Sequence, residues 1–312
     1  MPGGTPYITP AMLAARPAGI SWLNVPTLTA DTAAQQAQIA QECWAATSAV
    51  DRYCRHPLRA SVLTESGRGP GLPRVYADRS TGLVTLVTRS WPVVTVEAVQ
   101  YALAPPFGSF PPAWQAVPGS AWNIRTPVLT SAAGGLATGP SGGNVIDLAP
   151  GYVDWSYGRG GYEVMWSYAA GWPHAGITGT AAAGASVLEV DDVTAWAGWS
   201  GYLYDGVSSE QVTVTTAEAT APVSLPGAGG TVQAGPGTLT LSGPLAYEHS
   251  AGAVVSALPP DVIEATALQA AVQALLVLEG IAVQSMSGRA PGGTGVLATE
   301  VEMMLDDYRR VA

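Results

Sequence analysis

The sequence predicts an α+β fold: a helical bundle, with a long N-terminal helix and further C-terminal helices, around a central antiparallel β region that carries an inserted small all-β module. Two segments, residues 29–56 and 259–284, show helical periodicity, and the chain between them alternates short strand-like runs with Gly- and Pro-rich turns. The composition offers few tools for catalysis, because charged residues make up only 12% and lysine is missing. We therefore expect a protein that works by fitting against other proteins.

The charge balance limits the classes of partner. The formal net charge is −10, and an acidic chain is poorly suited to wrapping DNA because that affinity comes mainly from neutralising phosphates. The N-terminus has neither the basic region nor the apolar core of a signal peptide. The longest apolar stretch, residues 265–283, is interrupted by Gln269, Gln273 and Glu279, so we expect no membrane span.

The first element is an extended arm over residues 1–28, with at most a short turn at Pro10–Ala15, because prolines recur at positions 2, 6, 10, 17 and 26. A helix then starts at Thr29 or Asp31. Its apolar positions step by three or four residues, which predicts one buried face: Ile39, Cys43, Ala46, Val50 and Tyr53.

The two cysteines lie on this same predicted helix. Cys43 and Cys54 would be about 16 Å apart along it at 1.5 Å per residue, too far to bond within that helix. We expect buried free thiols in a reducing compartment.

The β region starts near Arg74. Residues 83–88 and 93–101 are β-branched runs, and residues 162–168 alternate, with Tyr162, Val164, Trp166 and Tyr168 on one face. Residues 176–257 hold short strand candidates at regular spacing, which indicates an inserted barrel or sandwich.

Two helices close the chain. Pro259 and Pro260 open the first, which is apolar nearly all round and so predicted to be buried on more than one side. A Gly-rich hinge, residues 287–295, precedes the second. Its apolar stripe would either dock on a partner or fold back onto the chain's own core, and the sequence leaves both open: Val301, Met304, Leu305 and Tyr308.

Chemical motifs are scarce. His56, His174 and His249 fall in three different predicted elements, and no Cys/His spacing resembles a zinc site. Asp191 and Asp192 lack the ligand ladder of a calcium loop. We expect no catalytic residue, no metal and no cofactor. A glycosidase using two carboxylates that meet in space ranks lowest among the alternatives.

Five short sequence segments, in this order along the chain, resemble those of a known protein family. The chain has "Tyr-Ile-Thr-Pro" at 7–10, "Val-Asp-Arg-Tyr-Cys-Arg-His-Pro-Leu" at 50–58, "Ser-Trp-Pro-Val-Val-Thr-Val-Glu-Ala-Val" at 90–99, "Val-Met-Trp-Ser-Tyr-Ala-Ala-Gly-Trp-Pro" at 164–173 and "Leu-Pro-Pro-Asp-Val-Ile-Glu-Ala-Thr" at 258–266. It resembles the head–tail connector (adaptor, or head-completion) proteins of long-tailed bacteriophages. The resemblance covers residues 7–103, 144–173 and 258–285.

The resemblance implies a non-enzymatic virion neck protein, made in the host cytoplasm. It would form a homo-oligomeric ring, usually dodecameric, between the portal protein and a neck or tail-completion protein. Double-stranded DNA would pass through its channel without specific binding, and no membrane would be involved. The expected divisions are an arm (1–28), a connector core (29–175 and 258–285), an inserted module (176–257) and a tethered docking helix (286–312).

Two residue sets follow from this expectation. The predicted portal-docking residues are Val301, Met304, Leu305, Tyr308, Arg309 and Arg310. The predicted subunit-interface residues are Ile263, Ala267, Ala270, Leu275, Leu278, Trp166 and Tyr168. The alternative is a receptor- or glycan-binding virion protein that uses the aromatic-rich β module, where Trp196 and Trp199 would stack on sugars.

Overall fold

The structure of the chain is a computed structural model. It describes residues 4–15, 32–69, 74–78, 80–103, 114–125, 145–150, 162–206, 208–225, 230–283 and 294–309.

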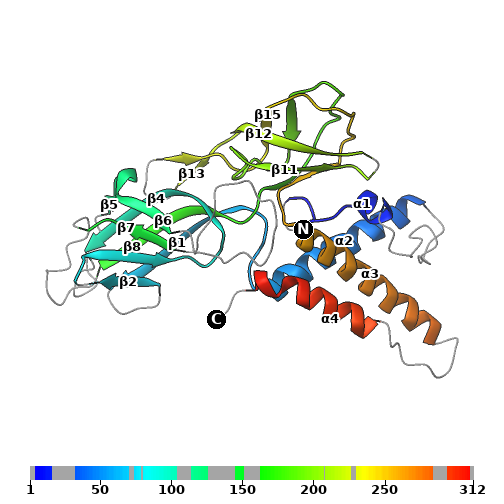
Figure 1. Cartoon of the computed structure of the whole chain (residues 1–312), viewed down its shortest axis with the longest axis horizontal. Helices are drawn as coiled ribbons and strands as arrows, with labels where there is room; N and C mark the ends of the chain where they lie inside the picture. The colour runs from blue at the N-terminus through cyan, green and yellow to red at the C-terminus, as the bar shows by residue number, and fades with distance from the viewer. Residues whose placement is uncertain are drawn as a thin grey trace.

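The described part of the chain is mostly β, with 16 strands against four α-helices. The predicted helical bundle around a central β region is therefore wrong, because the helices form only one layer at one end (Figure 1). The error has a physical cause. Many of the strands have only two to five residues, too short to show a period in sequence, whereas the long helices repeat their pattern over several turns.

The first half of the β structure is a sandwich of two antiparallel sheets. One has the order β1-β8-β4-β5 and the other β2-β3-β7-β6. Large buried side chains from both sheets meet between them, including Trp166 and Val99 from one, and Leu86, Ile146 and Leu148 from the other. The strands are β1 (Ser61–Gly69), β2 (Val75–Asp78), β3 (Leu83–Val87), β4 (Val93–Leu103), β5 (Gln115–Ala116), β6 (Trp122–Arg125), β7 (Val145–Leu148) and β8 (Tyr162–Ala170).

The second half is one six-stranded antiparallel sheet of order β10-β15-β12-β11-β16-β9. Its end strands are joined by the bridge between Ile177 and Val190, so the sheet curls into a small barrel. Leu188, Leu203 and Leu239 are fully buried within it. The strands are β9 (His174–Gly176), β10 (Val187–Val190), β11 (Ser200–Tyr204), β12 (Ser209–Ala219), β15 (Gly237–Leu241) and β16 (Val254–Ser256).

A hairpin reaches from the barrel toward the sandwich (Figure 1). It consists of β13 (Val223–Ser224) and β14 (Thr231–Val232). Leu225 and Val232 form a small apolar cluster with Ala98 of β4, so the two β parts touch directly as well as through the chain that links them.

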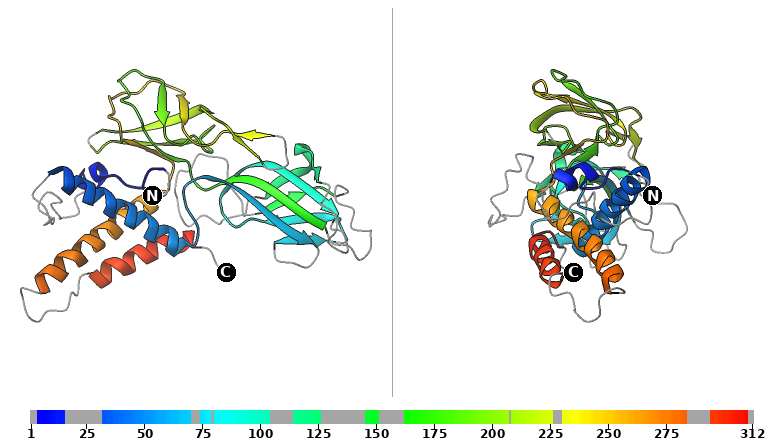
Figure 2. Two further views of the ribbon diagram at one scale, coloured as in Figure 1. Left: turned by 180° about the vertical axis from the view of Figure 1, so that it is seen from behind. Right: turned by 90° about the vertical axis from the view of Figure 1, so that its right-hand side faces the viewer.

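The helices pack together at the other end of the molecule (Figure 2). They are α1 (Pro10–Ala15), α2 (Thr32–Cys54), α3 (Pro260–Val283) and α4 (Thr294–Leu305), the last continued by a 3₁₀ turn, Asp306–Tyr308. Helix α3 contacts both α2 and α4. Their buried side chains belong to the same hydrophobic cluster as the barrel interior, so helices and barrel share one core.

The buried face of α2 includes Cys43, Ala46, Val50 and Cys54, spaced by three or four residues. Both thiols are free, and burial raises the pKa of each to about 12. They are therefore protonated near neutral pH and unreactive. Arg55 ends the helix with φ of 64°, the left-handed conformation in which helices commonly end.

The N-terminal segment, residues 4–9, joins the parts. Tyr7 is fully buried. Its hydroxyl donates to Asp51 Oδ1 at 2.5 Å and accepts from the backbone N–H groups of Leu58 at 2.9 Å and Arg59 at 3.1 Å. Its backbone N–H donates to Thr47 Oγ1 at 3.0 Å. One side chain thus fixes the arm, helix α2 and the entry into the sandwich in one arrangement.

The same segment reaches the barrel. Thr5 Oγ1 donates to Asp191 Oδ2 at 2.7 Å, and His174 Nε2 donates to the Pro6 carbonyl at 2.9 Å. Gly176 leaves no room for a side chain, because a Cβ there would collide with Thr5 Oγ1. Residues 5–9 of the arm are therefore a structural element that contacts helix α2, the barrel and the chain entering the sandwich.

Tyr7→Phe tests this junction. Removing the hydroxyl takes one donor from Asp51 and one acceptor from the N–H groups of Leu58 and Arg59, while Leu58 N still donates to Asp51 Oδ1 at 3.2 Å. We therefore expect the free energy of unfolding to fall by about 1–3 kcal/mol. Urea denaturation followed by fluorescence measures the change. Tyr76→Phe is the matched control, because Tyr76 is 58% exposed. A loss at Tyr7 no larger than at Tyr76 would contradict the role given to this hydroxyl.

Candidate interaction surfaces

The predicted docking stripe lies against the chain's own core. Val301, Leu305 and Tyr308 are buried, and Met304 packs against the same cluster. Of the two predicted arginines, Arg309 is exposed and its guanidinium carbon lies 5.1 Å from the centre of the Tyr53 ring. Arg310 lies outside the described residues. The described stripe thus takes the second of the two arrangements that the sequence left open, and portal docking by these residues stays a prediction.

The end of the chain is held by polar and aromatic contacts. Tyr53 Oη donates to Asp306 Oδ1 at 2.6 Å, and His56 Nε2 lies 3.2 Å from the Tyr308 carbonyl. The Tyr308 and Trp172 rings meet edge to face at 5.7 Å. These contacts tie α4 to the C-terminal end of α2 and to the start of the barrel.

The predicted interface residues on α3 divide into two groups. Ile263, Ala267 and Ala270 are buried in the core shared by helices and barrel. Leu275 and Leu278 lie in the second half of the same helix, where their side chains fall outside the described part. The sequence of this half, Ala-Val-Gln-Ala-Leu-Leu-Val-Leu-Glu-Gly-Ile-Ala-Val, is apolar with one charge.

The two predicted interface aromatics lie inside the sandwich. Trp166 and Tyr168 are fully buried between its sheets. The Tyr168 hydroxyl donates to Glu65, and burial together with this carboxylate raises the pKa of Tyr168. Glu65 also receives a hydrogen bond from Arg74 at 2.9 Å. The alternation of residues 162–168, from which an interface was predicted, therefore reflects the core between the two sheets.

The tryptophans expected to stack on a sugar are also buried. Trp196 and Trp199 are 0% and 2% exposed, so neither presents a ring to solvent. The exposed aromatic rings of the barrel include Tyr202 and Tyr247. The half-buried Tyr204 lies beside Tyr202 on β11, with the ring centres 6.0 Å apart.

Each of the three histidines has its own hydrogen-bond partners. Burial lowers the pKa of His174 to about 4. Its Nδ1 accepts from Ser256 Oγ at 2.9 Å, so this serine–histidine pair is neutral and enclosed. It holds the arm to the barrel and has no open side for a substrate.

His249 lies between two carboxylates that the sequence analysis missed. Its Nδ1 is 3.0 Å from Asp205 Oδ2 and its Nε2 is 2.8 Å from Glu210 Oε1. Glu210 also receives the N–H groups of Ala246 and Tyr247, and together these donors lower its pKa against the opposing effect of burial. The three residues come from separate strands and loops, so no local spacing could reveal them.

The adjacent acids Asp191 and Asp192 serve as hydrogen-bond acceptors within the barrel. Asp191 accepts from Gly176 N at 2.7 Å, and Asp192 accepts from Thr194 N at 2.9 Å and Gly235 N at 3.1 Å. Among the residues that the structure describes, no group of three His, Cys, Asp or Glu side chains could hold a metal ion. None of the helices in that part of the chain has the length and apolarity to cross a membrane.

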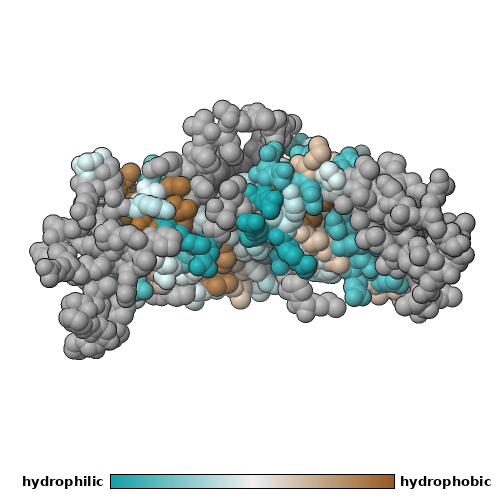
Figure 3. Space-filling model, turned by 90° about the horizontal axis from the view of Figure 1, so that it is seen from below, coloured by the Kyte–Doolittle hydropathy of each residue, from teal (hydrophilic) through white to brown (hydrophobic). Residues whose placement is uncertain are grey.

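The outer face of α4 combines charge with an exposed apolar side chain. Met303 is 72% exposed, and Glu300, Glu302, Asp306 and Asp307 are exposed beside it. Hydrophilic residues gather near the middle of this side of the molecule, where α4 lies (Figure 3). This face is open in the single chain.

Comparison with protein-family models, with curated proteins and with solved structures found no match to this chain.

His174→Gln tests the buried histidine through pH. The folded pKa of about 4 lies below the usual 6.5, so the unfolded chain binds the extra proton first as pH falls. Stability from this group is complete above pH 6.5 and is lost as pH falls toward 4, by about 3 kcal/mol.

We therefore expect the variant to be less stable at pH 7 but to lose less stability between pH 6.5 and 4, as measured by urea denaturation across that range. Asp51, whose pKa is raised mainly by burial, titrates in both proteins and cancels in the comparison. Equal pH slopes for the two proteins would show that His174 is not buried in its neutral form.

Proposed function

We propose that this protein is a structural virion component, a head–tail adaptor that forms a homo-oligomeric ring between portal and tail and continues the DNA channel. The observation that carries the proposal is helix α3. It spans 24 residues, and its only charged residues are Asp261, Glu264 and Glu279. A helix that is apolar nearly all round needs neighbours on every side. Its first half, with Val262, Ile263 and Ala270, is covered by the chain's own core, and we assign to neighbouring subunits the contact with its second half, whose sequence from residue 271 to 283 carries one charge.

The arrangement of the parts supports the same proposal. The molecule is elongated, with a helical layer at one end and a β-sandwich at the other (Figure 1). Two unlike ends suit a subunit that contacts two different partners. We assign the portal contact to the helical end and the neck or tail-completion protein to the β end.

The buried stripe of α4 has a supporting role in this scheme. Val301, Leu305 and Tyr308 hold the helix on the core, so contact with the portal falls to the exposed side, which includes Met303 and Arg309. The net charge of −10 suits a channel through which DNA slides, because acidic walls release no counterions from the duplex. The glycan-binding alternative loses its two expected stacking residues, Trp196 and Trp199, to the barrel interior.

Leu278→Glu tests the role of α3 in the ring. We expect wild-type protein to form rings, alone or on purified portal, and the variant to remain monomeric, because a carboxylate in an apolar subunit contact is strongly unfavourable. Mass photometry measures the assembly state, and circular dichroism checks that the helices persist. Gln41→Glu, at an exposed position of α2, adds the same charge as a control. Rings formed equally by both variants would remove α3 from the interface.

Deletion of the gene from a phage tests the joining role itself. We expect negative-stain microscopy of the lysate to show separate heads and tails, with heads that have lost their DNA, and complementation to restore whole particles. Complete particles that fail to adsorb to cells would overturn the adaptor proposal and favour a receptor-binding role.

A further inference from the structure

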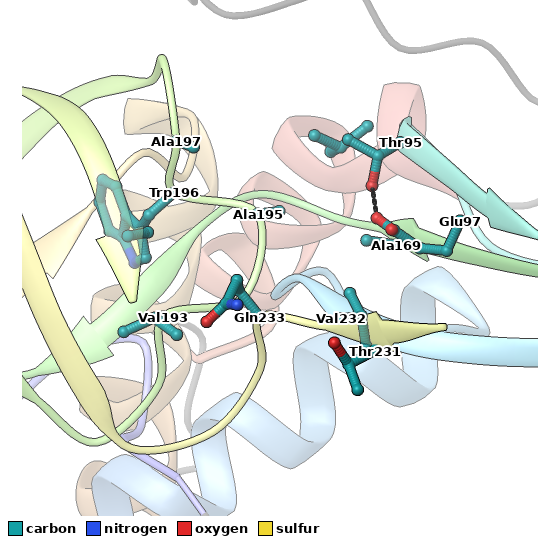
Figure 4. A pocket seen from close by; sticks show the side chains of 12 residues that line it. Thr95, Glu97, Ala169, Val193, Ala195, Trp196, Ala197, Thr231, Val232 and Gln233 are labelled. Atoms are coloured by element: carbon teal, nitrogen blue, oxygen red, sulfur yellow. Dashed lines mark hydrogen bonds between the residues drawn. The ribbon is translucent and has the colours of Figure 1, made fainter. Parts of the chain in front are cut away.

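A cavity of about 250 Å³ lies between the sandwich and the barrel. Strands β4 and β8 form one wall, the barrel loop 193–197 forms another, and the hairpin strand β14 lies along a third side (Figure 4). Its lining residues are far apart in the sequence, so sequence analysis could not reveal it.

Backbone irregularities on two walls shape this cavity. Strand β4 slips its register against β8 twice, between Val93 and Thr95 and between Val96 and Ala98. The extra residues, Val94 and Glu97, both line the cavity. Such bulges re-aim side chains and are common beside functional sites. On the opposite wall Ala195 has φ of 62°, a conformation that costs energy for a residue with a Cβ and persists only when its surroundings impose it.

The walls are made largely of small side chains. Four alanines line the cavity, Ala169, Ala195, Ala197 and Ala217. A methyl group on each side leaves a space that larger residues would fill, and close-packed proteins contain few such voids. Val94 and Val232 add apolar surface. The cavity therefore offers an apolar slot with room for one long side chain.

The cavity has a negative charge and no positive charge among its described lining residues. Glu97 supplies a carboxylate, whose hydrogen-bond donor within the cavity is the Thr95 hydroxyl (Figure 4). Gln233 uses its oxygen to accept from Ala219 N at 2.6 Å, and its NH₂ group remains as a donor. Among the described residues that line the cavity, none is basic. A cation on an apolar stem would complement both the charge and the walls.

We propose that this cavity binds an arginine or lysine side chain presented by a partner protein. The alkyl stem would lie between the alanine methyl groups, and the cationic head would donate to the Glu97 carboxylate, a charge-assisted hydrogen bond of the stronger kind. Long basic side chains bury their stems on apolar surface while the charge stays at a polar rim. The site requires neither a ring nor a portal and stands apart from the adaptor proposal.

Two matched peptides test the site on the full-length protein. The probe is the tripeptide acetyl-Ala-Arg-Ala-amide, and its control replaces arginine by citrulline, which has nearly the same shape without the charge. Amide shifts in ¹H–¹⁵N NMR spectra report binding. We expect the arginine peptide to shift the amides of Glu97, Ala195 and Gln233, with Kd on the order of 1 mM, and the citrulline peptide to bind about tenfold more weakly.

Three variants separate charge from shape. Glu97→Gln should abolish the difference between the two peptides, and Ala217→Leu should block both by filling the cavity. Glu248→Gln, which removes an exposed acid elsewhere on the barrel, should leave binding unchanged. Thermal melting confirms that each variant is folded.

Equal binding of the two peptides, shifts away from the cavity, or no effect of Glu97→Gln would each overturn the proposal. Spermidine, tested in parallel, covers a free polyamine as the source of the cation. Tighter binding of spermidine than of the arginine peptide at the same amides would assign the site to a small molecule and reject a protein partner.

Discussion

The arrangement of this molecule depends on the hydroxyl group of Tyr7. It is the meeting point of three segments: it donates to Asp51 on α2 and accepts the N–H groups of Leu58 and Arg59, where the chain enters the sandwich. Burial and the neighbouring carboxylate raise the pKa of Tyr7 well above its ordinary value, so the hydroxyl keeps its proton and its donor role. In a buried site, each hydrogen bond that is not made costs the full desolvation energy of its polar groups. These hydrogen bonds therefore fix the relative orientation of the three segments, which apolar contacts alone would allow to vary.

The consequences of this junction reach the cavity between sandwich and barrel. The chain leaves the sandwich at Gly171, which has φ of 104° and whose missing Cβ would lie 2.5 Å from the Arg59 carbonyl. Trp172 then exchanges backbone hydrogen bonds with Leu58 and Ala60. The N-terminal segment also contacts the barrel, through His174 on β9 and through Asp191, which follows β10. These contacts hold the sandwich and the barrel at fixed positions, which leaves a space between β4, β8 and the loop 193–197. The space stays open because the alanines that line it are too small to fill it.

The sequence predicted the two long helices well, but it did not predict that strands would outweigh helices in the fold. Helices α2 and α3 begin and end within three residues of the predicted segments 29–56 and 259–284, because a pattern sustained over six turns is hard to mistake. The fold class was wrong because strands such as β5, β13 and β14 have two residues each, too few to show a period in the sequence. The same limit applies to sites. Alternation at Trp166 and Tyr168 indicates a buried face but cannot say whether a sheet or a second subunit covers it. His249 with Asp205 and Glu210, and Glu97 with Gln233, are brought together only by the barrel and its docking on the sandwich.

The fixed arrangement of helices, barrel and sandwich would help subunits to close the ring that we propose. Every subunit of a closed ring must present its contacts at the same angle, since a small variation at each step would prevent closure. In this chain the helical layer and the barrel share one hydrophobic core, which makes them a single unit. The sandwich is attached to that unit through hydrogen bonds at Tyr7, Leu58 and Trp172 and through the apolar contact of Val232 with Ala98. Two separated attachments fix a direction as well as a position, so a partner bound at the β end would be held at a defined angle to the helical end.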